Sequence, residues 1–86
     1  MKIKKKFHTD PAHGWLEVNY SELKDLKIED KISSYSYTKD DIVYLEEDCD
    51  AAVYLDAIKA QGNEIEFIEL NNPVNYHEIR DYKSFA

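Results

Sequence analysis

The sequence predicts an α+β domain in which a mostly antiparallel sheet of about five strands carries two helices. Three features indicate this: segments in which apolar and polar residues alternate, stretches with apolar residues at helical spacing, and short polar turns between them. The expected element order is ββαββαβ, followed by a C-terminal tail. A chain of 86 residues has the size of one domain, so we expect residues 1–86 to form a single unit.

The best-defined unit of the prediction runs from Ile42 to Gly62, IVYLEEDCDAAVYLDAIKAQG. The apolar residues 42–45 indicate a strand that is buried on both faces. After an acidic turn, a helix is expected, with Asp48 or Asp50 placed to cap its N-terminus. Gly62 favours the left-handed conformation that ends a helix, near Gln61. The apolar stripe of this helix consists of Ala51, Tyr54, Leu55 and Ile58.

The N-terminal half predicts two amphipathic strands, at 2–7 and 15–20, joined by a loop that contains Pro11 and Gly14. The first strand is rich in lysine, and such charges typically protect the edge of a sheet from pairing with another chain. The lysines of the first strand are Lys2, Lys4, Lys5 and Lys6. Ser21 is placed as the N-cap of a short helix that follows the second strand.

Further along the chain, the pattern predicts a strand at 32–38 that forms a hairpin with the strand at 42–45. This strand would place Tyr35 and Tyr37 on one face. Another strand is expected at 64–70, with apolar residues on both of its faces, which predicts either two covered faces or a bulge near Phe67. For the tail, residues 74–86, a loose helical turn and an extended arm packed on the sheet remain alternatives.

The net charge of −7 argues against a general affinity for nucleic acid, because phosphate binding requires cations. A single cysteine, Cys49, excludes an internal disulfide and is typical of a reducing compartment. We interpret this cysteine as structural. The sequence shows no signal peptide and no apolar stretch of membrane-spanning length. A cytoplasmic protein with no membrane partner is therefore expected.

The loop from His8 to Trp15, HTDPAHGW, concentrates the residue types that carry chemistry. His8, Asp10, His13 and Trp15 are candidate binding residues. Together with Arg80, the two histidines and the aspartate offer the alternative of a small-ligand site or a minor hydrolase. In a purely structural interpretation, Asp10 bonds the loop backbone in an Asx-type turn. The spacing matches no zinc signature, and we predict no metal site, no catalytic residues and no cofactor.

Acidic and aromatic residues provide the remaining candidates. The turn residues Glu46, Glu47 and Asp48 either cap the helix and face solvent or form a negative surface for a basic partner. Tyr35 and Tyr37 suit a half-buried interface, with coverage of that face by the tail as the alternative. Arg80, the only arginine, is expected to ion-pair with Glu46, Asp48 or Asp50, or to contact an anion.

Four segments resemble a family of small uncharacterised proteins found in phages, plasmids and bacterial chromosomes. They are HTDPAHGWLEV (8–18), DKISSYSY (30–37), VYLEEDCDA (43–51) and IRDYKSF (79–85), and the resemblance covers nearly the whole chain. It implies that the HTDPAHGW loop, the VYLEEDCDA turn and the Ile-Arg tail matter together. It implies no particular enzymatic activity.

The functional expectation is therefore an acidic accessory protein of a phage or mobile element that acts by protein–protein binding. Its partner would be a host protein with a basic surface, for example a nucleic-acid-handling defence enzyme such as a CRISPR nuclease. Acidic side chains can occupy a basic groove that normally receives nucleic acid. A structural or oligomerising module is a further alternative, and both a monomer and a homodimer are compatible with the sequence.

Overall fold

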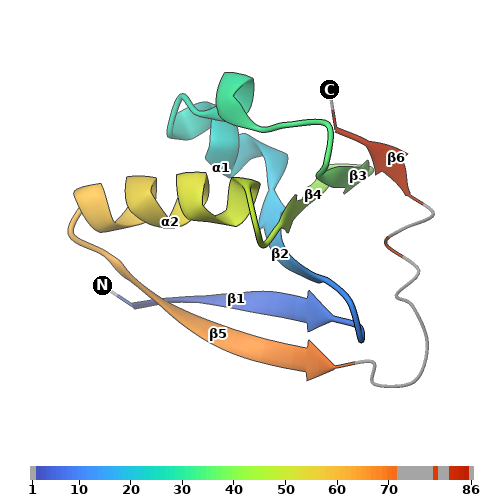
Figure 1. Ribbon diagram of the computed structural model, residues 1–86. Helices are drawn as coiled ribbons and strands as arrows, with labels where there is room; N and C mark the ends of the chain where they lie inside the picture. The colour runs from blue at the N-terminus through green and yellow to red at the C-terminus, as the bar shows by residue number, and fades with distance from the viewer. Residues whose placement is uncertain (1, 72–78, 80–81, 86) are drawn as a thin grey trace.

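The computed structural model describes residues 2–71, 79 and 82–85. Within these residues, two α-helices accompany a six-stranded sheet of order β5-β1-β2-β4-β3-β6 (Figure 1). The elements are β1 (Lys2–Thr9), β2 (Gly14–Asn19), α1 (Tyr20–Asp25), the 3-10 helix η1 (Glu29–Lys31), β3 (Tyr37–Lys39), β4 (Ile42–Glu46), α2 (Asp50–Ala60), β5 (Glu64–Asn71) and β6 (Lys83–Ser84).

The predicted fold class and element order are confirmed, but the sheet is mixed. Antiparallel pairing joins β1 to β2, β2 to β4, β4 to β3 and β3 to β6. In contrast, β5 pairs with β1 in parallel along its whole length, from Lys2 beside Glu64 to Thr9 beside Asn71. The connection through α2 explains this, because the helix carries the chain back across the sheet before β5 begins.

The expectation that the lysine-rich strand lies at the edge is wrong. β1 is an interior strand between β5 and β2. Its charges are matched instead: Lys2 and Lys4 each lie 3.8 Å from Glu66, and Lys5 Nζ lies 2.6 Å from the Glu22 carboxylate. Lysines on an interior strand are therefore accommodated by acids on β5 and α1, which the local pattern of β1 does not reveal.

The unit from β4 to α2 forms as predicted, with one change at its start. The N-cap position of α2 is Cys49, and Asp50 is the first helical residue. The helix ends at Ala60 with Gln61 as C-cap, and Gly62 takes the positive φ of 81° that favours glycine at this position. The start of α1 also differs, because Asn19, not Ser21, is its N-cap. The Glu22 carboxylate accepts a hydrogen bond from the Asn19 amide at 2.8 Å.

The predicted strand at 32–38 is confirmed only at its C-terminal end. β3 begins at Tyr37, and Tyr35 lies in the preceding loop, so the two tyrosines do not share a strand face. The hairpin from β3 to β4 is present, and Asp40 takes a positive φ of 56° in its turn. For β5, neither predicted option holds, because its pairing with β1 shows no bulge and Ile68 and Leu70 are each 42% exposed.

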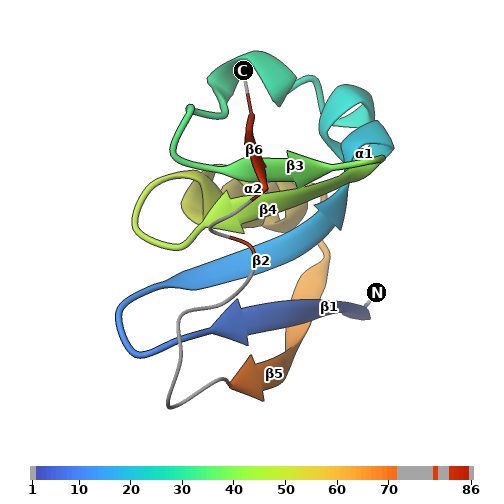
Figure 2. The same ribbon diagram turned by 90° about the vertical axis from the view of Figure 1, so that its right-hand side faces the viewer.

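The helices cover one face of the sheet. Leu16 pairs with Leu45 and Val18 with Val43, so alternation places these side chains on the same face. There they form the core with Leu23 of α1, with Ile28 and Ile32, which flank η1, and with buried residues of α2. Figure 2 shows α2 behind the sheet and β6 beside β3 at the sheet's edge. The buried residues of α2 in this core are Ala51, Tyr54 and Ile58.

The opposite face carries aromatic and polar side chains. Tyr44 lies on this face, and the Tyr82 ring packs against its ring with centroids 5.2 Å apart. Ile79 is fully buried, and the Phe85 amide donates to the Ser36 carbonyl at 2.8 Å. The described tail residues thus combine the two alternatives: the Tyr82 amide donates to the Ile79 carbonyl at 3.0 Å in a turn, and β6 extends the sheet beside β3. The rest of the predicted tail, residues 74–78, 80–81 and 86, lies outside the described residues.

Candidate functional site

The register of β2 and β4 begins the site on the helix-free face. Trp15 pairs with Glu46 across the two strands, so their side chains lie next to each other. Tyr37, on the neighbouring β3, brings its ring to 6.4 Å from the Trp15 ring in an edge arrangement. Two aromatic rings and one carboxylate are therefore held together by sheet pairing over long distances in the sequence.

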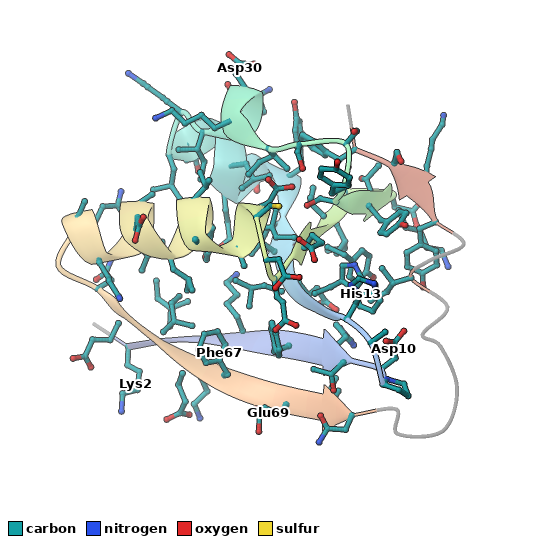
Figure 3. All side chains as sticks on the ribbon, in the orientation of Figure 1. Lys2, Asp10, His13, Asp30, Phe67 and Glu69 are labelled. Atoms are coloured by element: carbon teal, nitrogen blue, oxygen red, sulfur yellow. The ribbon has the colours of Figure 1, made fainter. Side chains whose placement is uncertain are left out.

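The loop after β1 places His13 beside this group. The Asp10 side chain accepts hydrogen bonds from the amides of Ala12 and His13, each at 2.9 Å, in the predicted Asx-type turn. The Asp10 amide in turn donates to the His13 carbonyl at 2.9 Å. In Figure 3, His13 and Asp10 lie at the same end of the sheet, far from Lys2 at the other end of β1. The loop backbone thus fixes the start of β2.

The acidic turn after β4 closes over the same end of the sheet. The Glu47 amide donates to the Gly14 carbonyl at 3.0 Å, and the Asp48 amide donates to Glu46 Oε2 at 3.0 Å. A side chain at Gly14 would force its neighbours to shift, because its Cβ would lie 2.7 Å from the Phe7 ring and 3.1 Å from Glu47 Cδ. The absence of a Cβ at this position lets the loop and the turn approach each other.

A buried hydrogen-bonded hub holds the tyrosine segment against the turn. The Ser36 hydroxyl donates to the Asp50 carboxylate and accepts from the Glu46 amide at 3.0 Å. Asp50 also accepts from the Ser33 hydroxyl at 2.7 Å and from the Ser33 amide at 3.1 Å. Asp50 is 3% exposed and Ser36 is fully buried, so these bonds fix the loop that carries Tyr35.

These elements surround a hollow of about 470 Å³, which we call the acidic–aromatic hollow. Tyr35 lies at its rim and is 69% exposed, whereas Trp15 is 2% exposed. Such a mixture of apolar walls with a few polar groups is typical of a binding site. The residues that line it are His13, Trp15, Tyr35, Tyr37, Glu46, Asp48 and Cys49.

Three side chains of the hollow converge. His13 Nδ1 lies 3.9 Å from Glu46 Oε1, and one ligand atom each of His13, Glu46 and Asp48 lie within 4.8 Å of one another. The Glu46 side chain is 11% exposed and that of His13 is 43% exposed. The arrangement concentrates negative charge at one wall of the hollow and places an imidazole beside it.

Cys49 also lines the hollow, and its surroundings make it a weak nucleophile. Partial loss of water around the thiol and then the charges and hydrogen bonding of nearby carboxylates, Glu46 first, raise its pKa above the ordinary value. A higher pKa leaves less thiolate at neutral pH. The prediction that Cys49 is not a nucleophile is consistent with this, although the residue is exposed.

The predicted site residues divide into two groups. The structure brings six of them together in the hollow: His13, Trp15, Tyr35, Tyr37, Glu46 and Asp48. Three others do not line it. His8 Nε2 lies 2.8 Å from Glu17 Oε1, Asp10 bonds the loop backbone, and Glu47 lies in the turn near Gly14. Arg80 and its expected ion pairs with Glu46, Asp48 or Asp50 lie outside the described residues.

Sequence reasoning missed two participants, Cys49 as a lining residue and Ser36 as the support of the tyrosine loop. Ser36 had one usable signal, because it is a small polar residue between two tyrosines within the predicted strand at 32–38. The position of Cys49 depends on how the turn closes, which no local pattern specifies.

In comparisons with known proteins, no protein-family model, curated protein or solved structure matches this chain. None of the helices formed by the described residues has the length and apolar character needed to cross a membrane.

Proposed function

We propose that this protein binds a basic protein partner and that the acidic–aromatic hollow receives an arginine or lysine side chain of that partner. The observation that carries the proposal is the presence of Glu46 and Asp48 in one hollow with Trp15, Tyr35 and Tyr37. Carboxylates attract the positive charge, and the aromatic faces accept it through cation–π contact.

The physical chemistry favours arginine as the preferred group. A guanidinium can stack on an aromatic ring while its N–H groups face carboxylates, whereas an ammonium is more strongly hydrated. A cation–π contact contributes about 0.5–2 kcal/mol, depending on how much water is removed. Tyr35 at the exposed rim has the character of residues that contribute strongly to protein interfaces.

The net charge of −7 supports a partner with a basic surface, because long-range attraction would speed the encounter. In the finer form of the proposal, the partner is a host enzyme that handles nucleic acid, such as a CRISPR nuclease, and the protein acts in the host cytoplasm by occupying its basic groove. The resemblance to phage and plasmid proteins supports this form. The site requires only one copy of the chain.

The alternative of a small-ligand site or hydrolase receives less support. It requires His8, Asp10 and His13 to converge with Arg80, but His8 and Asp10 do not line the hollow that contains His13. The Asp10 carboxylate is occupied by two backbone amides.

The first test uses Trp15 as a reporter, because it is the only tryptophan and lines the hollow. A short arginine peptide is titrated while Trp15 fluorescence is followed, and a peptide with neutral citrulline in place of arginine serves as the control ligand. We expect a saturable change with the arginine peptide only, weakened by salt. Equal responses to both peptides would contradict the proposal.

A matched pair of variants locates the binding. Asp48→Asn and Glu47→Gln each remove one negative charge from the same turn, but only Asp48 lines the hollow. We expect Asp48→Asn to lower the affinity for the arginine peptide about two- to fivefold and Glu47→Gln to lower it less. For the finer form, a partner captured from host lysate at low salt should be lost with Asp48→Asn and displaced by nucleic acid. If the same partner is captured by the Asp48→Asn variant and is not displaced by nucleic acid, the finer form of the proposal is refuted.

A further inference from the structure

Glu46 presents an unusual electrostatic situation. The residue is 9% exposed, and its carboxylate faces the hollow. Among the described residues, the cation-capable group within ion-pair distance of it is the His13 imidazole, at 3.9 Å, which is too far for a hydrogen bond. Buried carboxylates in proteins are normally paired with a cation or coordinate a metal ion. Among the residues that the structure describes, Glu46 therefore has no close positive partner at the point where it meets His13 and Asp48.

The geometry points to a binding site for a divalent transition-metal ion, such as Zn²⁺, formed by His13, Glu46 and Asp48. One ligand atom from each residue lies within 4.8 Å of the other two. Two segments that are far apart in the sequence supply these donors: His13 comes from the loop before β2, and Glu46 and Asp48 come from the end of β4 and the turn before α2. An ion placed between them would give Glu46 the cation that its burial requires.

The donor types select the class of metal. An imidazole nitrogen with two carboxylates is a ligand set used by zinc and its neighbours in the first transition row. Calcium and magnesium prefer oxygen ligands alone, and magnesium retains much of its water. Three protein ligands leave at least one coordination position for water or for a group from a partner. Cys49 lines the same hollow.

Only a small adjustment would be needed to complete the site. Ligand atoms around a zinc ion lie about 2.0–2.2 Å from the metal, so the present separations must shrink slightly. Asp48 is exposed, and the His13 side chain is 43% exposed, so both can move toward the more buried Glu46. The Asp48 amide already donates to Glu46 Oε2, which orients that carboxylate.

This inference goes beyond the proposed function, because the metal site does not require a protein partner. The two are linked, since a metal ion would neutralise the same carboxylates that attract an arginine side chain. Bound Zn²⁺ is therefore expected to lower the affinity of the protein for the arginine peptide.

The test is calorimetric titration of Zn²⁺ into metal-free protein, without any peptide. We expect one saturable site per chain. His13→Gln and Asp48→Asn should each lower the affinity for Zn²⁺ by at least about tenfold, whereas Glu47→Gln should change this affinity less than twofold. Circular dichroism checks that each variant is folded. Absence of a saturable site in the folded wild-type protein, or equal affinity in all three variants, would overturn the inference.

The visible absorption of bound Co²⁺ provides a second readout. It reports on the ligands of the metal, so a variant that alters only the stability of the fold would not change it. Co²⁺ bound to His13, Glu46 and Asp48 should give visible absorption bands that Zn²⁺ displaces and that His13→Gln abolishes. Cys49→Ser is the control for binding at the thiol alone. If Cys49→Ser removes the bands while His13→Gln retains them, the proposed ligand set is wrong. Neither result depends on the arginine peptide, so this inference and the proposed function fail separately.

Discussion

Replacing Ser36 with alanine removes the hydroxyl that joins the tyrosine loop to both β4 and α2. This hydroxyl donates to the Asp50 carboxylate and accepts from the Glu46 amide, and the residue is fully buried. The hydrogen bond to a charged group contributes about 1.5–3 kcal/mol, and the one from the neutral amide about 0.5–1.5 kcal/mol. Water cannot readily replace the lost oxygen, so the expected loss in the free energy of unfolding is about 2–4 kcal/mol.

That loss is large for a chain of 86 residues, whose total stability is expected to be about 4–13 kcal/mol. Urea denaturation followed by circular dichroism measures it, and the midpoint of thermal unfolding should fall by about 10–25 °C. The matched control is Ser34→Ala, because Ser34 is exposed and should change stability by less than about 0.5 kcal/mol. Similar small losses for both variants would refute the assignment of Ser36 as a structural hub.

The remaining predictions concern three other positions. Burial and then the charge of Glu22 raise the pKa of Tyr54. As the pH rises, the unfolded chain therefore loses the Tyr54 proton first, and the free energy of unfolding should fall above about pH 10, by up to about 1.4 kcal/mol per pH unit. Tyr54→Phe should remove this part of the alkaline loss, and the same slope of stability against pH in urea titrations of both proteins would contradict it. Gly14→Ala should cost about 1–3 kcal/mol, because the new Cβ would press on the Phe7 ring; a neutral effect in thermal unfolding would show that the ring moves freely. The raised pKa of Cys49 predicts alkylation by iodoacetamide that is slower at neutral pH in the folded protein than in urea, and faster reaction in the folded protein would disprove it.

Local patterns were sufficient to predict the unit from β4 to α2. Residues 42–45 carry the apolar run of a buried strand, and Gly62 marks the end of the helix at which it takes a positive φ. These signals depend on a few neighbouring residues and on backbone sterics. For the same reason the Asx-type turn at Asp10 could be predicted, because the acceptor and its donors lie within three residues of each other.

The position of β1 in the sheet and the grouping of the site residues depend on long-range strand pairing, which local sequence patterns do not reveal. The lysines of β1 are compatible with an edge strand, and only the parallel arrival of β5 makes the strand interior. Likewise, His13 and Glu46 meet because Trp15 pairs with Glu46 in the sheet. A one-residue change of that register would send the Glu46 side chain to the other face. The candidate residues were thus largely identifiable, whereas their grouping depended on tertiary structure.

The central claim is that the acidic–aromatic hollow binds a cationic group. The most direct measurement is a two-dimensional NMR titration of ¹⁵N-labelled protein with the arginine peptide. The account predicts saturable shifts at the Trp15 indole and at the backbone amides of His13, Tyr35 and Asp48, with Leu70 on β5 unchanged. Shifts that centre on β5 or α1 while these signals stay in place would contradict it.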